Sequence, residues 1–257
     1  EYRTESLDSP QSKASVHGLQ LGIDVWRAQD WRGGLFMGLL DGQADVSGFA
    51  SGRVGYVGHS DTSSRYLGLY ATRTWDGGAY LDLVLQGARH RSDLRTLKNA
   101  QGKQSGTAWA LSAEIGKPYL LRGSAWTIEP QAQLVLHRLS RDDERIFGDT
   151  TISYDSDTAW LARLGVRAQA HYELNGAWFD PYLRANLYHQ NAGRDRSTFR
   201  TGSGRTNFDT PFDYTSAELS IGGTYAVGAR TQIYGEVGRL WSFDRDTRLD
   251  ASVEASL

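Results

Sequence analysis

Apolar and polar residues alternate with a period of two along most of this chain. In residues 126–138, Ile128 and Leu134 lie on one side of an extended strand, and Glu129 and Gln131 lie on the other. A helix would scatter the apolar residues of such a segment over opposite faces, so the pattern predicts strands. An acid and amides in a row would make a poor core for a soluble sandwich, but they suit a barrel with lipid outside and water within.

The same alternation returns throughout the sequence. The expected strands are a fragment at residues 2–7 and segments at residues 19–26, 34–48, 64–75, 79–91, 105–117, 126–140, 158–173, 178–190, 213–227, 231–243 and 248–257. These segments predict about twelve antiparallel strands, each long enough to cross a bilayer when tilted.

The connections between these segments are alternately short and long. The short connections are residues 27–32, 76–78, 119–124, 174–177 and 228–230. The longer, polar connections are residues 49–62, 94–104, 141–157 and 191–212, with residues 8–14 and 244–247 as shorter members of the same set. Strands that run up and down through a membrane produce this alternation, because one rim carries turns and the other carries loops. The Greek-key crossings of a soluble sandwich would not produce it.

Tryptophan residues fall at the ends of the expected strands. Those next to the short connections are Trp26, Trp31, Trp75, Trp126 and Trp178, and those next to the long connections are Trp109, Trp160 and Trp241. Aromatic girdles at both headgroup levels fix the depth of a membrane-spanning barrel. The alternative, tryptophans scattered through a core, would place some of them in strand centres.

Charge decides which face of each strand is turned to lipid. In residues 79–91, Leu81, Leu83 and Leu85 alternate with Asp82 and Gln86. An ionised side chain at lipid depth costs several kcal/mol, so the charged face is predicted to line the lumen. The lumenal residues predicted in this way include Asp24, Asp82, Gln131, Gln133 and Arg163.

Composition narrows the class of protein further. The chain has 257 residues, 39% of them hydrophobic, and a net charge of -2. With a mean hydropathy of -0.50 it contains no run of the roughly 18 apolar residues that a membrane helix needs. The absence of cysteine argues against a disulfide scaffold or a thiolate metal site. The charge balance implies no broad basic surface for nucleic acid, and none is expected as a partner.

Seven of the segments form a recognisable series. In chain order they are residues 17–26 (HGLQLGIDVW), 66–75 (YLGLYATRTW), 78–87 (GAYLDLVLQG), 111–116 (LSAEIG), 128–134 (IEPQAQL), 162–166 (ARLGV) and 180–187 (DPYLRANL). Over nearly the whole chain this series resembles the C-terminal translocator domain, or β-domain, of Gram-negative type V autotransporters. Each motif alone is weak, whereas seven in the same order and spacing are much more specific.

The resemblance implies a single translocator domain over residues 1–257, folded as a twelve-stranded outer-membrane barrel. Its implied function is secretion or surface display of its own N-terminal passenger, a property associated with virulence, with a linker helix threading the pore. The implied partners are outer-membrane lipid, the passenger and linker helix, the barrel-assembly machinery and periplasmic chaperones.

Two departures from the family pattern concern the ends of the chain. Members usually end in an aromatic residue that closes the last strand, whereas this chain ends at Leu257. Members also carry a linker helix before the first strand, whereas this chain starts at Glu1 in strand-like sequence and shows no signal peptide. The passenger and most of the linker helix are therefore expected to lie upstream, with trimming at both ends.

Cross-strand pairs can be predicted from the turns, because residues that face each other across a hairpin have a constant sum of residue numbers. With turns centred between residues 121 and 122 and near residues 148, 175 and 201, the predicted pairs are Glu114–Glu129, Glu129–Arg167, Arg167–Arg184 and Arg184–Glu218. All face the lumen by parity, and with one further acid they form a predicted lumenal belt of Glu114, Glu129, Arg167, Arg184, Glu218 and Glu236.

Three interpretations of this belt are open. Its charges can simply neutralise one another and keep the pore hydrated, as polar barrel interiors do. They can dock the pore helix or the moving passenger, because desolvated charges hold a specific partner. The third follows from resemblance to those autotransporters that cut their own passenger inside the barrel with lumenal acids and a linker asparagine, which would make the belt catalytic.

No other catalytic or metal chemistry is predicted. The six histidines are dispersed, and the sequence contains no G-x-S-x-G motif. His137 and His171 point inward by parity, but neither has the His-x-x-x-His or cysteine partner of a metal site. The chain is therefore expected to need no cofactor or metal and to have no catalytic residue outside the belt.

Two other classes of protein share parts of this pattern. A passive outer-membrane channel for small solutes would have the same fold, and it differs from a translocator in what precedes residue 1. A soluble β-sandwich that binds a ligand would fold without detergent.

Overall fold

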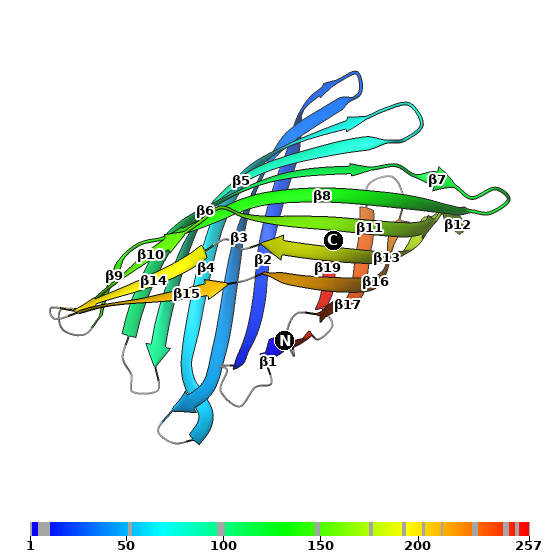
Figure 1. Cartoon of the computed structure of the whole chain (residues 1–257). Coiled ribbons are helices and arrows are strands. Elements are labelled where there is room, and N and C mark those ends of the chain that lie inside the picture. The colour runs from blue at the N-terminus through cyan, green and yellow to red at the C-terminus, as the bar shows by residue number, and fades with distance from the viewer. Residues whose placement is uncertain are drawn as a thin grey trace.

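The protein is described by a computed structural model over residues 2–4, 11–50, 53–96, 101–146, 150–174, 177–191, 194–201, 204–211, 213–227, 231–243, 247–249 and 252–256. It is an all-β protein with two antiparallel sheets (Figure 1). Within the described residues, no helix is long and apolar enough to cross a membrane.

The main sheet has 15 strands. They are β1 (Tyr2–Thr4), β2 (Gln11–Ala28), β3 (Trp31–Ala50), β4 (Arg53–Thr74), β5 (Tyr80–Thr96), β6 (Gln101–Gly116), β7 (Tyr119–Leu120), β8 (Trp126–Arg141), β11 (Ala159–Ala170), β12 (Tyr172–Leu174), β13 (Ala177–Asn191), β16 (Tyr214–Val227), β17 (Thr231–Ser242), β18 (Thr247–Leu249) and β19 (Ser252–Ser256). The second sheet has 4 strands, which are β9 (Glu144–Ile146), β10 (Thr150–Ser156), β14 (Arg194–Thr201) and β15 (Gly204–Pro211).

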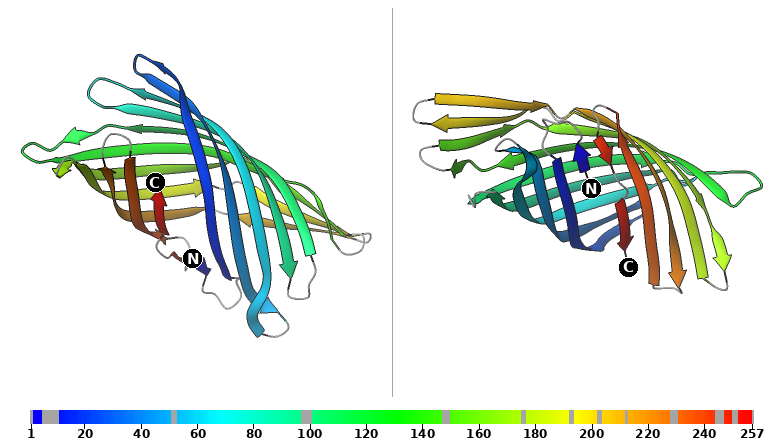
Figure 2. Two further views of the ribbon diagram at one scale, coloured as in Figure 1. Left: turned by 180° about the vertical axis from the view of Figure 1, so that it is seen from behind. Right: turned by 90° about the horizontal axis from the view of Figure 1, so that it is seen from below.

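The main sheet follows chain order from β2 to β17 and then continues through β18 to β1. The short strands β7 and β12 follow β6 and β11 in the chain and pair with β8 and β13. The short strand β19 follows β18 and pairs with β17. These three strands therefore continue the strands before them and do not add crossings of the sheet. The sheet curls into a half-barrel, and β1 pairs with β18, which brings the two ends of the chain close together (Figure 2). The predicted antiparallel all-β architecture is confirmed.

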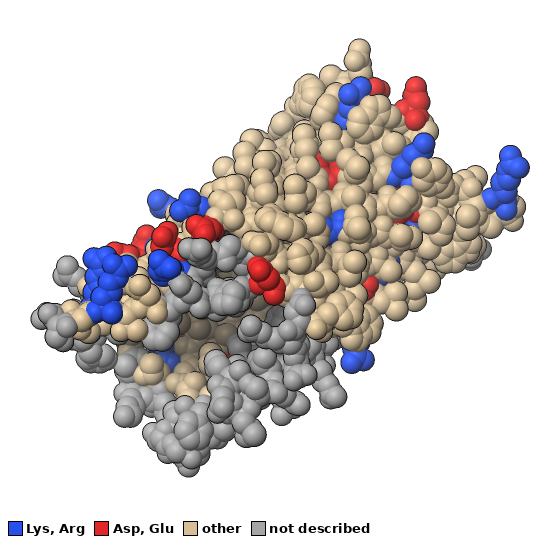
Figure 3. Space-filling model, viewed as in Figure 1, with Lys and Arg blue, Asp and Glu red and all other residues tan. Residues whose placement is uncertain are grey.

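One face of the curled sheet is apolar and exposed. Cross-strand pairing aligns Met37 with Leu67, Leu69 with Leu85, and Leu85 with Leu111. All of these side chains are exposed, with Leu67 and Met37 at 58% and 59%. The broad centre of the face in Figure 3 is largely uncharged, and many of its charged side chains lie toward the two ends. Such a continuous apolar band requires a non-aqueous environment or a partner.

The long connections differ from the prediction, because much of each one is strand. The strand β3 runs to Ala50, and β4 begins again at Arg53. The stretches 141–157 and 191–212, predicted to be loops, contribute all four strands of the second sheet. Because these stretches are polar, their sequence did not predict strands. In the second sheet Ile152 and Thr198, on the paired strands β10 and β14, are 8% and 5% exposed.

Turn geometry sets the register of the hairpin between β6 and β8. Gly123 has a φ of 74°, in the left-handed region that favours glycine, and the Leu121 N–H donates to the Trp126 carbonyl. The turn is therefore centred near residues 123 and 124, two residues later than predicted. As a result Glu114 faces Gln133, and the predicted Glu114–Glu129 pair is wrong.

Two local irregularities affect residues singled out from the sequence. The ladder between β2 and β3 shifts between Asp24 and Trp26, so Trp26 pairs with Gly33 and Asp24 with Gly34. Such a bulge turns Trp26 away from the face that carries Asp24. Pro130 has no N–H to donate, and it lies where the regular pairing of β6 with β8 ends, beside Gly116–Gln131. On this side of β8 the ladder is therefore open at the proline.

Several predictions fall on residues that the structure does not describe. Glu1 and Leu257 lie outside the described residues, as do the turn centres at residues 148 and 175.

Candidate functional site

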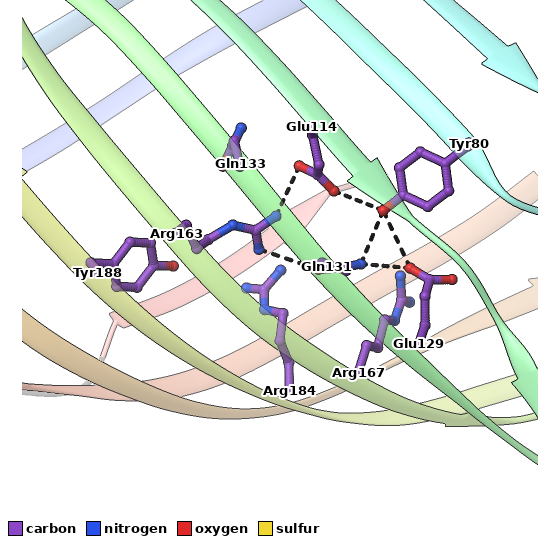
Figure 4. A pocket seen from close by; sticks show the side chains of 9 residues that line it. All are labelled: Tyr80, Glu114, Glu129, Gln131, Gln133, Arg163, Arg167, Arg184 and Tyr188. Carbon is purple, nitrogen blue, oxygen red and sulfur yellow. Dashed lines mark hydrogen bonds and ion pairs between the residues drawn. The ribbon is translucent and has the colours of Figure 1, made fainter.

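A cluster of polar side chains lies on the face of the sheet opposite the apolar band. It surrounds a cavity of about 550 Å³. We call it the polar cluster; its lining residues are Tyr80, Glu114, Glu129, Gln131, Gln133, Arg163, Arg167, Arg184 and Tyr188. Figure 4 shows these side chains converging from adjacent strands. Charges of both signs and hydroxyl groups therefore meet in one place.

Strand pairing brings the cluster together from segments far apart in the sequence. In one cross-strand row, Asp82 faces Glu114, Glu114 faces Gln133, Gln133 faces Arg163, and Arg163 faces Tyr188. In a second row, Glu129 faces Arg167, which faces Arg184. Because side chains alternate along each strand, both rows lie on the same face. The register of five strands thus determines the composition of the site.

Arg163 on β11 is the most enclosed charge of the cluster, with 8% of its surface exposed. Its guanidinium forms an ion pair with Glu114 at 2.8 Å and donates hydrogen bonds to Gln131 at 3.3 Å and Asn186 at 3.2 Å. Its buried Nε has no hydrogen-bond partner in the described structure. A buried cation is tolerated only when it is paired, so these three contacts hold Arg163 in place.

The hydroxyl of Tyr80 lies between the two acids of the cluster. It lies 2.7 Å from Glu114 and 3.3 Å from Glu129, and it accepts a hydrogen bond from the Gln131 amide at 3.2 Å. The same amide donates to Glu129 at 2.6 Å. These neutral donors replace the direct acid–acid contact that the sequence predicted.

Two further acids adjoin the cluster through Arg184 on β13. Arg184 forms ion pairs with Glu236 and, at 3.7 Å, with Glu218. Glu218 also accepts hydrogen bonds from Asn186 at 2.8 Å and Tyr188 at 2.6 Å. Each acid of this part therefore has a cation and neutral donors around it.

Glu236 has a matching set of tyrosine donors. Tyr182 and Tyr234 both donate to its carboxylate, the latter at 3.0 Å. Their hydroxyl groups are 2.5 Å apart, and the rings stack with centroids 6.2 Å apart. Tyr182 is 2% exposed, so this contact is inside the protein.

Arg167 is held in a different way from the other two arginines. It faces Glu129 across the ladder, yet no ion pair joins the two side chains, both of which are described. Its guanidinium instead lies over the Tyr182 ring, 4.2 Å from the centroid, and its Nε is buried without a partner. Nε lacks a partner in Arg163 and Arg184 as well, but these two form ion pairs through their terminal nitrogens, so Arg167 retains the most capacity for an added acceptor.

Comparison with known proteins identifies the domain. The family model for the autotransporter β-domain matches residues 2–238. The chain belongs to this family. The BrkA autotransporter of Bordetella pertussis (strain Tohama I) is 30% identical over 203 residues, which are 75% of this chain and 18% of that protein. The chain spans about a fifth of the length of the curated relatives that it matches.

Solved structures of autotransporter domains share the fold. The β-domain of Bordetella BrkA superposes with a TM-score of 0.69 at 25% identity, covering 95% of this chain and 90% of that one. The transport unit of the autotransporter AIDA-I from Escherichia coli superposes with a TM-score of 0.80 at 14% identity, covering 96% of this chain and 83% of that one. The expected family, and with it the architecture of a translocator β-domain, is confirmed.

The β-domain brings together most of the residues singled out from its sequence. Four belt residues line the cavity, namely Glu114, Glu129, Arg167 and Arg184, together with Gln131, Gln133 and Arg163. Glu218 and Glu236 join them through Arg184. Two predicted cross-strand pairs are confirmed, Glu129–Arg167 and Arg167–Arg184. The predicted Arg184–Glu218 pair is wrong by two residues: Arg184 faces Ser220, because β14 and β15 pair Thr201 with Gly204, in a register centred later than residue 201.

Two predicted lumenal acids have contacts apart from the cavity. Asp24 accepts a hydrogen bond from Tyr70 and lies 4.0 Å from Arg32. Asp82 accepts a hydrogen bond from Thr72 at 2.5 Å. Both share the polar face of the sheet, and neither lines the cavity of the polar cluster.

Sequence reasoning missed the neutral members of the site. These are Tyr80, Tyr182, Asn186, Tyr188 and Tyr234, which supply most of the donors to the acids. All five have the parity of the polar face, so the alternation contained the signal. A search for formal charge alone passed over them.

The structure offers no metal site in the part of the chain that it describes, where no three His, Cys, Asp or Glu side chains are grouped to hold an ion. Of the two inward histidines predicted from parity, His171 lies 2.5 Å from Asp180 and stacks on the Trp178 ring. The polar cluster can bind and orient an incoming polar chain, and it can screen charge.

Proposed function

We propose that residues 1–257 form a single translocator domain that sits in the Gram-negative outer membrane and moves its own N-terminal passenger to the cell surface. The observation that carries this proposal is the division of one curled sheet into an exposed apolar face and a polar face with a charged cavity. The family match over residues 2–238 and the likeness to an AIDA-I transport unit support it.

The polar cluster is the part of this domain that meets the moving chain. Arg163 and Arg184 are engaged by acids, while Arg167 rests on an aromatic ring and faces the cavity. A passing backbone carbonyl or a linker side chain can accept from its guanidinium without breaking an existing ion pair. The belt residues therefore line the pore and hold the segment that threads it.

Other partners follow from the same setting. Lipid covers the apolar face, and the tryptophans at the strand ends lie at the two headgroup levels; Trp26, Trp75, Trp109, Trp178 and Trp241 are all exposed. Assembly factors and periplasmic chaperones insert the strands into the membrane. A role of the belt in cutting the passenger remains a prediction that the same experiment tests.

The test uses the full reading frame that encodes this chain, with an epitope tag upstream of residue 1. In a Gram-negative host we expect the tag to become accessible to protease added to intact cells. Arg167→Gln is expected to slow display severalfold while leaving the folded barrel on unheated gels, because the passing chain loses one contact. Arg122→Gln, an exposed turn residue, is the matched control and should display normally.

Two results would overturn the proposal. A tag that stays inside the cell although the barrel is assembled would exclude a translocator. An ion conductance in planar bilayers that the upstream segment does not reduce would instead favour a passive channel for small solutes.

The catalytic interpretation of the belt has its own test. Normal processing of the passenger in the Glu129→Gln variant would exclude a catalytic role for Glu129.

A further inference from the structure

Three arginines lie on the outer face of the sheet, beyond its apolar band. Arg65 on β4 shares parity with Leu67, and Arg89 and Arg91 on β5 share parity with Leu85. All three arginines are exposed. We call them the outer arginine patch, and they point away from the polar cluster.

Two members of this patch face each other directly. Arg65 is the cross-strand partner of Arg89, and Arg91 follows two positions later on the same face. On the flanking strands Arg65 faces Leu39 and Arg89 faces Thr107, neither of which is charged. Like charges directly opposite each other destabilise a sheet unless another group compensates. None of the three forms an ion pair with an acid in the described part of the chain.

The position of the patch indicates where the compensating charge lies. Along β5 the outer residues run from Leu85 through Gly87 to Arg89 and Arg91, so the surface changes from apolar to basic within a few residues. Gly87 faces Leu67 on one side and the exposed ring of Trp109 on the other. An aromatic ring at this boundary is typical of the headgroup level of a membrane.

The surface at this boundary also contains an open space. A methyl group built on Gly87 would meet no atom within 4 Å, so no side chain covers the sheet between Leu67 and Trp109. This uncovered position has the arginine pair on its loop side and the leucines on its other side. A lipid with a compact anionic headgroup fits this arrangement, with its headgroup at the arginines and its apolar chains along the leucines.

We propose that the outer arginine patch binds the phosphate of a phosphorylated glycolipid in the outer leaflet, whose acyl chains lie along Leu67, Leu85 and Trp109. A guanidinium can donate two parallel hydrogen bonds to a phosphate, and two guanidiniums on facing residues can bind one phosphate or two neighbouring ones. The lipid phosphate then removes the repulsion between Arg65 and Arg89. This proposal rests on the proposed function, because it places the loop end of the sheet in the outer leaflet.

The test compares lipid binding by wild-type protein and by Arg65→Gln/Arg89→Gln. Refolded protein is titrated with bis-phosphorylated lipid A in mixed micelles, and bound lipid is counted by native mass spectrometry. Loss of two charge-assisted contacts is expected to weaken binding about tenfold. Arg27→Gln/Arg122→Gln is the matched control. Both residues are exposed at the short-turn end, and the two substitutions remove the same amount of positive charge as the patch variant. The control should change binding less than about twofold.

Three further arms identify the source of the phosphate. Dephosphorylated lipid A should bind the wild type as weakly as lipid A binds the patch variant. Inorganic phosphate should compete only at far higher concentration, because it lacks acyl chains. Arg65→Lys/Arg89→Lys should restore part of the affinity, since charge remains while the paired hydrogen bonds are lost.

Several outcomes would overturn the proposal. Equal weakening in the patch and control variants would show general charge attraction, and equal binding of dephosphorylated lipid A would exclude the phosphate. Equal dependence of phosphatidylglycerol binding on the patch would exclude a glycolipid as the occupant. If the protein inserts into vesicles and displays its passenger but shows none of these differences, only this inference fails; if it does not insert at all, the proposed function fails.

Discussion

The polar cluster and the outer arginine patch each place two arginines directly opposite each other on neighbouring strands of one sheet. In the cluster Arg167 faces Arg184, and in the patch Arg65 faces Arg89. On the polar face the protein itself compensates the repulsion, because Arg167 stacks on Tyr182 and Arg184 pairs with acids. On the outer face the pair is exposed, and the residues directly opposite it on the next strands, Leu39 and Thr107, are uncharged.

This difference follows from the surroundings of each pair. On the inner face of the curled sheet, where the side chains of Arg163 and Arg184 are 9% and 28% exposed, an unpaired charge is unfavourable, and the sequence supplies acids and hydroxyl groups on adjacent strands. An outward arginine beyond an apolar band can take its counter-charge from lipid. The acids Asp41, Asp61 and Asp93 lie farther along the same outer face, and in the described part of the chain none of them forms an ion pair with Arg65 or Arg89. A like-charge pair in this fold is thus compensated from within or from outside according to the face that it occupies.

The largest expected effect comes from breaking compensation inside the polar cluster. Arg163→Met should lower the free energy of unfolding by about 3 kcal/mol, because it leaves Glu114 enclosed without its cation. Urea unfolding in detergent, followed by the unheated gel shift, measures the change. Adding Glu114→Gln should recover much of the loss, since the orphaned charge is then removed. A loss below about 1 kcal/mol in the single variant would mean that water already screens Arg163.

A smaller effect is expected from the neutral donors of the same cluster. Tyr182→Phe removes a hydroxyl that contacts Glu236 and Tyr234 inside the protein, at a cost of about 1–2 kcal/mol. The control is Tyr119→Phe, whose ring is 52% exposed and which should cost less than about 0.5 kcal/mol. The same urea assay compares the two. Equal midpoints would show that the tyrosines of the cluster contribute packing rather than hydrogen bonds.

Alternation alone was sufficient to predict the antiparallel all-β architecture and to place the six belt residues on one face of the sheet. In antiparallel strands the period of two fixes orientation, so Glu129 and Arg167 fall on one face whatever the loops do. The register of that hairpin also followed from the sequence, because β9 pairs with β10 in the same register in which β8 pairs with β11. Strand number was close to expectation, and the additional segments arise where β6, β11 and β18 are interrupted.

The parts that failed depend on single turns and on polar packing. The turn at Gly123 places the register of the β6–β8 hairpin two residues later than predicted. As a result Glu114 faces Gln133 and not Glu129. Composition cannot reveal that shift, because several residues of the connection can form a tight turn. The second sheet was missed because its strands are polar and pair between two separate connections, β10 with β14. Non-local pairing of this kind leaves no period that a local reading can detect.

The outer arginine patch predicts an effect of opposite sign to that in the cluster. In detergent without anionic lipid, Arg65→Gln should raise the free energy of unfolding by up to about 0.5 kcal/mol, because it relieves repulsion with Arg89. Arg184→Gln should lower it, since Glu236 loses its cation. The urea assay again reports both. A destabilising Arg65→Gln in lipid-free detergent would show that the protein, and not lipid, compensates this arginine.

The smallest effect is expected at an outward-facing charge that does have protein partners. His59, near the loop end of β4, lies 2.7 Å from Asp45 and 3.1 Å from Asp61, one contact for each ring nitrogen. Two carboxylates can be satisfied at once only by the doubly protonated ring. The hydrogen bond that the ring donates to Asp45, followed by the one that it donates to Asp61, accordingly raises the pKa of His59 above its ordinary value of 6.5.

Because the pKa of His59 is higher in the folded protein than in the unfolded chain, its contribution is complete below the ordinary value and is lost as pH rises through the raised one. The cross-strand partner of His59 on β5 is Arg95, a like charge to the protonated ring. Hydrogen exchange of amides at the loop end of β3 and β4 should therefore quicken as pH rises above the ordinary value of 6.5, after correction for the intrinsic rate. His59→Gln and Asp45→Asn should each flatten this dependence. If both variants keep the pH dependence of the wild type, solvent and not these carboxylates compensates the charge at His59. The outward charge at His59 would then be compensated from outside the protein, as is proposed for Arg65 and lipid.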